Sequence, residues 1–222
     1  MQVVQRFAAW AEDQRSGPVA PEVLHHAKRA VIDWHAALLP GSIVPPAVFL
    51  EESLKEEIDR GAARLALGRA ATVRAAALIN GTAAHTMEVD DIFRDGIYHP
   101  GAPTISAALA LAQAHDVPGE RFLRAVIVGY EISTRIGAAM GRAHYKYWHN
   151  TGTIGCFGAC AAAAELLGLD ATRFAHALAT SPARLFDANI FHPEPRTLAL
   201  SAAMIVEGVI AAPLLWAGVN PV

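Results

Sequence analysis

The sequence predicts an all-α protein in which residues 1–222 form one compact multi-helix bundle. Hydrophobic residues make up 53% of the chain, which is ample for a buried core. Apolar residues recur at helical spacing through most of the sequence. Alanine-rich stretches, such as residues 161–164, would let helix axes approach closely. These three observations together favour a bundle with several buried helices.

Proline and glycine mark the boundaries of the first expected elements. Gly17 and Pro18 end the first amphipathic stretch, and Pro21 opens the second, because proline fits the first turn of a helix. Pro40 and Pro45 mark the turn that follows. The expected elements are helices over residues 3–14, 21–39, 48–60 and 72–91, the third of them charged and on the surface, with a short strand over residues 63–68.

Alanine-rich helices are expected in the second half of the chain. Pro103 and Pro118 each open a helix, and Asp170 is a good N-cap for a last helix that stops before Pro182. The expected helices cover residues 103–115, 118–140 and 151–167, and the stretch that begins at residue 170.

The charge composition indicates which class of partner the protein binds. A net charge of −3 without runs of like charge is not typical of proteins that bind nucleic acid or an anionic membrane, so a small-molecule partner is expected. Residues 198–219 are apolar enough to resemble a membrane span, but Glu207 and Pro213 favour a buried helix. The N-terminus lacks a secretion signal, and Cys156 and Cys160 form no disulfide framework, so a cytoplasmic protein is expected.

Two histidines each stand just before a glycine-containing turn that opens a helix. They are His99, in His99-Pro100-Gly101-Ala102-Pro103, and His149, in His149-Asn150-Thr151-Gly152-Thr153. The free N–H groups at a helix start attract carboxylates or phosphates. The positive end of the helix dipole also favours a neutral imidazole, which can accept a proton.

An acidic cluster of Glu88, Asp90 and Asp91 is expected at the C-terminal end of the 72–91 helix. The helix dipole disfavours each negative charge there by about 0.3–1 kcal/mol. A sequence that tolerates this cost often does so for a site, where a carboxylate can act as a base or orient a histidine.

Other interpretations of these residues are open. A histidine beside a turn is often a cap, and an acidic helix end is often simply solvated. His85, Asp90, Asp91 and His99 are possible metal ligands, but no tight ligand spacing occurs, so no metal is expected. The glycines after His149 do not match a nucleotide-binding fingerprint.

The ordered motifs resemble those of the MmgE/PrpD family. The resemblance rests on Ala77-Leu78-Ile79-Asn80-Gly81-Thr82-Ala83-Ala84-His85, on Val89-Asp90-Asp91 and on His99-Pro100-Gly101-Ala102-Pro103. The segments Pro21-Glu22-Val23-Leu24, His149-Asn150-Thr151-Gly152-Thr153-Ile154-Gly155 and Leu166-Leu167-Gly168-Leu169 are similar to flanking motifs of the family.

The resemblance implies the helical domain of a cofactor-independent enzyme, usually a homodimer, whose active site lies between this domain and a smaller lid domain. Family members include 2-methylcitrate dehydratase, cis-aconitate decarboxylase and dicarboxylate epimerases. By resemblance, this chain is expected to be a lyase or isomerase, most simply a carbon–oxygen lyase, that acts beside a carboxylate of a small polycarboxylic acid. The expected catalytic residues are His99, His149, Asp90 and Asp91, and the expected substrate-binding residues are Glu88, His85, Gly101, Thr151, Gly152, Thr153 and Arg196.

Two departures from the family pattern qualify this expectation. The family's later Thr-Lys and Leu-His-Ala-Gly motif should fall near residues 196–201, but its lysine and histidine are missing, and Arg196 is the candidate replacement for the positive charge. The sequence also stops at Val222, where the resemblance implies that a lid domain follows, so it is expected to be either a fragment or one half of a split enzyme. In the second case the expected partner is a separate chain that carries the lid, beside or instead of a second copy. The alternative is a non-catalytic scaffold or regulatory subunit that kept the fold and lost the lysine.

Overall fold

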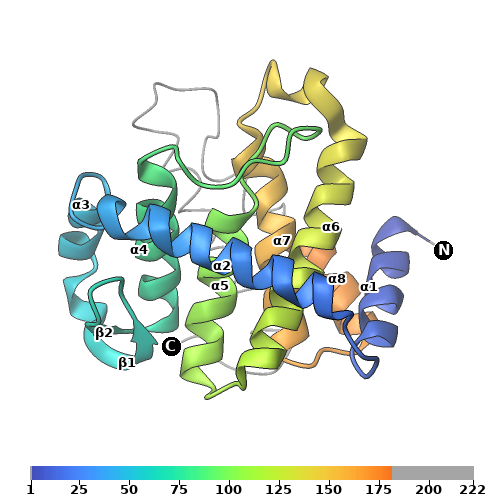
Figure 1. Ribbon diagram of the computed structural model, residues 1–222, viewed down its shortest axis with the longest axis horizontal. Coiled ribbons are helices and arrows are strands. Elements are labelled where there is room, and N and C mark those ends of the chain that lie inside the picture. The colour runs from blue at the N-terminus through green and yellow to red at the C-terminus, as the bar shows by residue number, and fades with distance from the viewer. Residues whose placement is uncertain (1, 182–222) are drawn as a thin grey trace.

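The computed structural model describes residues 2–181, and these residues are mostly helical, as the sequence predicts (Figure 1). The helices are α1 (Val3–Gln14), α2 (Pro21–Gly41), α3 (Ala47–Ser53), a 3-10 turn η1 (Lys55–Glu57), α4 (Val73–Thr86), α5 (Gly101–Ala114), α6 (Gly119–Tyr145), α7 (Asn150–Leu166) and α8 (Ala171–Thr180). A two-stranded antiparallel hairpin, β1 (Ile58–Arg64) and β2 (Ala70–Ala71), lies between α3 and α4. The apolar segment at residues 198–219 and His192 lie outside the described residues.

Capping side chains mark the starts of two helices. Asp170 caps α8, as the sequence predicts, by accepting a hydrogen bond from the N–H of Arg173. Thr72, the first residue of the predicted 72–91 helix, caps α4 by accepting one from the N–H of Ala75. Helix α6 is interrupted at Gly141, whose φ of 60° is not helical, so the expected end near residue 140 corresponds to a real break.

The predicted helix over residues 48–60 is wrong in its second half, since α3 ends at Ser53 and β1 begins at Ile58. Side chains of this segment instead pair with the hairpin. Arg69 forms ion pairs with Glu51 at 2.6 Å and with Asp59 at 2.7 Å. The backbone of β1 pairs with β2 across the hairpin, a contact that charge patterning alone does not reveal.

The core lies where α5 packs between α4 and α7, with α6 packed against α7. Small residues allow this close approach. A Cβ added to Gly129 of α6 would lie 2.7 Å from the carbonyl oxygen of Gly158 in α7, so only glycine fits there. Most of α7 is buried, which explains why its alanines and glycines show no polar face.

The outer helices are held to this core by buried polar contacts. Trp34 of α2, which crosses the front of the bundle in Figure 1, donates its indole N–H to the hydroxyl of Ser106 in α5 at 3.1 Å. Arg15, after α1, forms an ion pair at 3.1 Å with Glu165, a buried residue of α7. Asn80 of α4 accepts from the N–H of Ala66 and donates to the carbonyl of Arg64, which joins α4 to the hairpin segment.

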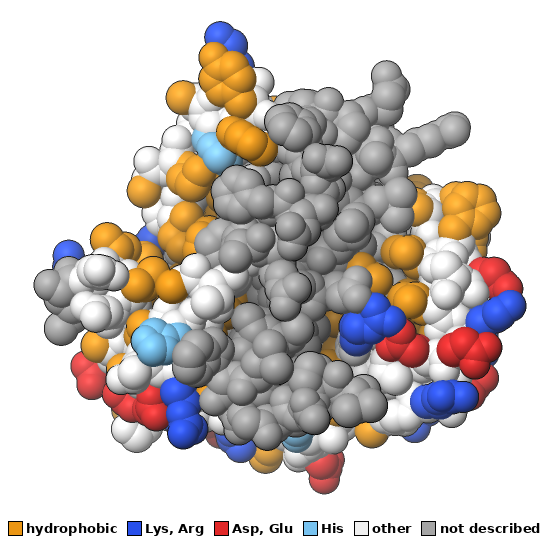
Figure 2. Space-filling model, turned by 180° about the vertical axis from the view of Figure 1, so that it is seen from behind, with side chains coloured by type: hydrophobic (Ala, Val, Ile, Leu, Met, Phe, Trp, Pro, Cys, Tyr) orange, Lys and Arg blue, Asp and Glu red, His pale blue; other side chains and the backbone are white. Residues whose placement is uncertain are grey.

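The surface is divided between charged and apolar regions. Figure 2 shows charged side chains gathered at the end formed by α3 and the hairpin, and hydrophobic side chains near the far tip of α6. Exposed apolar residues at that tip include Met140, Tyr145 and Tyr147. Within residues 2–181, no helix combines the length and apolarity needed to span a membrane.

Candidate active site

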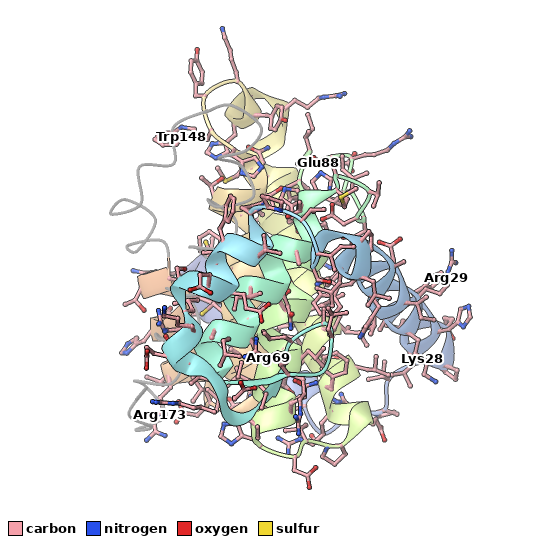
Figure 3. The ribbon with its side chains drawn as sticks, turned by 90° about the vertical axis from the view of Figure 1, so that its left-hand side faces the viewer. Lys28, Arg29, Arg69, Glu88, Trp148 and Arg173 are labelled. Atoms are coloured by element: carbon pink, nitrogen blue, oxygen red, sulfur yellow. The ribbon has the colours of Figure 1, made fainter. Side chains whose placement is uncertain are left out.

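The predicted site residues lie where the end of α4 meets the starts of α5 and α7. Figure 3 shows Glu88, two residues after α4, and Trp148, two residues before α7, at the same end of the molecule, with Arg173 of α8 at the other end. The loop after α4 therefore brings the acidic cluster beside two helix starts.

Three imidazole rings gather at this end. His85, in the last turn of α4, lies with its ring centroid 4.6 Å from that of His99 and 5.9 Å from that of His149, the latter pair stacked at 24°. His149 is the N-cap residue of α7, and His99 lies two residues before α5. The structure thus places both histidines that the sequence singled out, His99 and His149, beside the ring of His85.

Asp90 lies between two of these rings. Nδ1 of His85 lies 3.2 and 3.1 Å from the two carboxylate oxygens, and Nδ1 of His99 lies 3.2 Å from Oδ1. Burial raises the pKa of Asp90, but the contacts with His85 and His99 outweigh this effect and lower the pKa to about 2. Asp90 is therefore a carboxylate at neutral pH.

His99 is more accessible to solvent than His85, the other histidine that contacts Asp90. Its side chain is 17% exposed, whereas those of His85 and Asp90 are each 1% exposed. Burial lowers the pKa of His99, but the contact with Asp90 and the nearby charges of Glu88 and Asp91 give a net increase. His99 is thus a partly accessible imidazole whose charged form is stabilised by a buried carboxylate.

Asp91 has different partners from Asp90. Its carboxylate accepts a hydrogen bond from the N–H of Gly101 at 3.0 Å and one from the hydroxyl of Tyr130 at 3.0 Å. Burial, with smaller contributions from Asp90 and Asp33, raises the pKa of Asp91 to about 6 despite these hydrogen bonds. Asp91 holds the first residue of α5 in place, close to His99.

The helix starts that were expected to bind substrate are partly occupied by the chain itself. The N–H of Gly101 donates to Asp91, and the hydroxyl of Thr151 accepts from the N–H of His99 at 3.1 Å. The hydroxyl of Thr153 lies 2.9 Å from Nε2 of His144. Gly152 is buried in the first turn of α7. Thr151 therefore ties the two histidine motifs together.

The expected position of the acidic cluster at a helix end is wrong. Helix α4 ends at Thr86, so Glu88, Asp90 and Asp91 lie in the following loop, and the expected cost of negative charge in the last turn of a helix does not apply to them. Glu88 has a φ of 54°, is 53% exposed at its side chain, and lies 3.7 Å from Nε2 of His85 through Oε1. Arg196 lies outside the described residues.

Sequence reasoning missed two residues of this region, Tyr130 and His144. Tyr130 lies in the middle of α6, 39 residues from its partner Asp91, so no local signal identifies it. His144 lies nine residues before Thr153 and in no motif that the sequence analysis singles out, although this short separation is a signal that could have identified it.

His85, Asp90 and His99 could also hold a metal ion, since one donor atom from each lies within 4.8 Å of the others. Their spacing has a simpler explanation in the hydrogen bonds from His85 to Asp90 and the ion pair between Asp90 and His99. We therefore assign the three side chains as a hydrogen-bonded and ion-paired group.

Comparisons with known proteins give a consistent result. Residues 5–184 match the MmgE/PrpD N-terminal domain. The chain is 28% identical over 177 residues to a cis-aconitate decarboxylase-like protein, oryM, of Aspergillus oryzae, a match that covers 75% of this chain and 37% of that protein. It is 28% identical over 186 residues to cis-aconitate decarboxylase of Homo sapiens, covering 80% of this chain and 38% of that protein. The match to the Mus musculus protein of the same name is 35% identical over 109 residues, covering 47% and 22%.

Proposed function

The chain belongs to the MmgE/PrpD family, and from this premise we propose that it supplies the histidine–aspartate site of a cofactor-independent lyase or isomerase. The proposed substrate is a small di- or tricarboxylic acid, and the bond that changes lies beside a carboxylate. The observation that carries the proposal is the convergence of His85, His99 and His149 on one site with the buried carboxylate of Asp90.

The proposed chemistry is proton transfer by two imidazoles. In a dehydration, His99 or His149 removes the proton from the carbon beside the carboxylate, and the other protonates the departing hydroxide. In a decarboxylation, the bond to the leaving carboxylate breaks, CO2 departs, and a protonated imidazole gives its proton to the carbon that keeps the electron pair. Decarboxylation should be tested first, because the similar proteins are named as cis-aconitate decarboxylases or as like them.

Binding of the substrate's carboxylates requires positive charge. Thr151, Gly152 and Thr153 at the start of α7 offer the positive end of a helix dipole, and Arg196 is the proposed fixed cation. Glu88 borders the cluster and is proposed to contact the substrate through a hydroxyl or a protonated carboxyl group.

We also propose that the working enzyme includes further polypeptide, as a second copy of the chain or as a separate chain that carries a lid domain. Apolar side chains beside the cluster support this, because Met87, Val89 and Ile92 are all exposed in the loop after α4. The matches cover only 37% and 38% of the Aspergillus oryzae and Homo sapiens relatives, so the activity of those whole proteins is a proposal for this chain.

One observation favours a second candidate, a non-catalytic scaffold or regulatory subunit. The sequence has only three lysines, Lys28, Lys55 and Lys146, and none falls where the family's Thr-Lys motif is expected. Lys28 projects from α2, away from Glu88 and the site (Figure 3). A chain that kept the fold without its lysine would bind partners but not turn over substrate.

The test is turnover of cis-aconitate, which is measured by the release of CO2 and by the proton NMR spectrum of the product. Wild-type activity that falls by about 10²- to 10⁴-fold in His99→Gln and in His149→Gln supports the proposal. The matched control is His115→Gln, which changes an exposed histidine at the opposite end of α5. Thermal melts verify that the variants fold. Full activity in either site variant removes that residue from the mechanism, and an inert wild-type chain in tight complex with a partner supports the scaffold.

A further inference from the structure

His85 is the central ring of the cluster and the least suited to touch a substrate. Its side chain is only 1% exposed, and it lies between His99 and His149. The sequence-based expectation that His85 binds substrate does not agree with this burial. A buried imidazole that contacts a carboxylate needs a different explanation.

We propose that His85 is a positioning residue that competes with His99 for Asp90 and so limits how firmly this carboxylate holds a proton on His99. The inference rests on the proposed function only for the role of His99 as a proton carrier. The competition for Asp90 concerns the resting protein and can be measured without substrate.

His85 has the better hydrogen-bond geometry to the carboxylate of Asp90. Nδ1 of His85 is aligned for hydrogen bonding to both oxygens of Asp90, at 3.2 and 3.1 Å. Nδ1 of His99 lies at a similar distance from Oδ1, 3.2 Å, but among the described residues it has no aligned hydrogen-bond acceptor. The Asp90–His99 contact is therefore an ion pair whose alignment is poorer than that of the hydrogen bonds between His85 and Asp90.

The hydrogen-bond network assigns the proton on His85. Its Nε2 is buried and has no hydrogen-bond partner in residues 2–181, since Oε1 of Glu88 is 3.7 Å away. An N–H at Nε2 would leave a buried donor unpaired, whereas an N–H at Nδ1 is satisfied by Asp90. We therefore place the proton of His85 on Nδ1, where the carboxylate of Asp90 accepts it.

The titratable groups near His99 come from three parts of the chain. They are His85 of α4, Glu88, Asp90 and Asp91 of the following loop, and His149 at the start of α7. The three carboxylates stabilise a protonated His99, with Asp90 the strongest. If His85 did not occupy Asp90, the carboxylate could turn fully toward His99, and His99 would hold its proton more firmly. A more firmly held proton would make His99 a poorer base.

The experiment measures the pKa of His99 by NMR titration of its imidazole signals in the full 222-residue chain, with His99→Gln used to assign them. His85→Leu removes the competing donor and is expected to raise the pKa of His99 by about one unit, a tenfold change in proton affinity. His85→Asn keeps an N–H near the Nδ1 position and is expected to leave the pKa of His99 close to the wild-type value. His115→Leu is the control for a histidine far from the site.

An unchanged or lowered pKa of His99 in His85→Leu overturns the proposal, as does an equal increase in His85→Leu and His85→Asn. A second measurement on the wild-type protein covers the case in which His85→Leu does not fold. The ¹⁵N chemical shifts of His85 are expected to show a protonated Nδ1 and a bare Nε2. The opposite tautomer cannot donate to Asp90 and would also overturn the proposal.

The pH profile of turnover separates this inference from the proposed function. If the pKa of His99 rises in His85→Leu and the acidic limb of kcat/KM moves with it, both are supported. If the pKa rises and the profile does not move, His85 positions Asp90 as proposed, and His99 is not the base of the proposed reaction.

Discussion

Asp90 and Asp91 are adjacent in the chain, yet their carboxylates have separate partners and their pKa values are shifted in opposite directions. Asp90 contacts His85 and His99, and these contacts outweigh its burial, so its pKa falls to about 2. Asp91 accepts from Gly101 and Tyr130, and burial raises its pKa to about 6. The two residues therefore contribute to stability with opposite dependence on pH.

Asp90→Asn is expected to lower the free energy of unfolding by about 2 kcal/mol at pH 7. The folded-state pKa of Asp90 lies below the unfolded value of 3.8, so its stabilisation is present above about pH 4 and is lost as the pH falls toward about 2. Urea unfolding at pH 7 and at pH 3 measures the difference. The gap between variant and wild type should narrow at pH 3, and an equal gap at both values would contradict the assigned shift.

Asp91→Asn is expected to raise stability at pH 7.5 by about 1–3 kcal/mol and to change it little at pH 4. The folded-state pKa of Asp91 lies above the unfolded value, so the favourable contribution exists below about pH 4 and is lost as the pH rises through about 6. The amide oxygen of asparagine can still accept from Gly101. Chemical denaturation at the two pH values is the measurement, with Asp95→Asn, exposed in the same loop, as control. A loss of stability at pH 7.5 would show that the charge of Asp91 is needed for its hydrogen bonds.

Gly101→Ala is expected to destabilise the protein by about 1–3 kcal/mol and to lower turnover. An added Cβ would lie 2.6 Å from Oδ1 of Asp91 and 2.9 Å from the hydroxyl of Tyr130, so α5 would have to shift beside His99. The matched control is Gly119→Ala, since Gly119 also follows a proline and begins a helix, but its added Cβ would meet no atom within 4 Å. Equal melting temperatures for the two variants would contradict the close packing of Gly101.

Treatment with a chelator is expected to leave turnover and the melting temperature unchanged, because the interactions of Asp90 with His85 and His99 account for the spacing of these residues. The measurement is activity on cis-aconitate after dialysis against EDTA. Loss of activity that added Zn²⁺ restores would instead identify His85, Asp90 and His99 as metal ligands.

Local signals predicted most helices because proline, glycine and capping residues act on their near neighbours. Asp170 caps α8 as expected, and α4 begins beside Thr72, where the predicted helix starts. The same reasoning failed for the hairpin, where β1 is fixed by backbone pairing with β2 rather than by a local signal. It also placed the end of α4 too late, since the apolar and acidic pattern continues past Thr86 while the helix stops there.

The sequence by itself determined most of the helices, the family and the position of His99 and His149 just before two helix starts, because these features depend on short motifs. Only the tertiary structure decided which carboxylate faces which imidazole. Asp90 and Asp91 differ by one position in a loop, and their directions follow from the packing of α4, α5 and α6, including a hydrogen bond from Tyr130 that spans 39 residues. Contacts between such distant segments form only when the helices pack, so no local pattern records them.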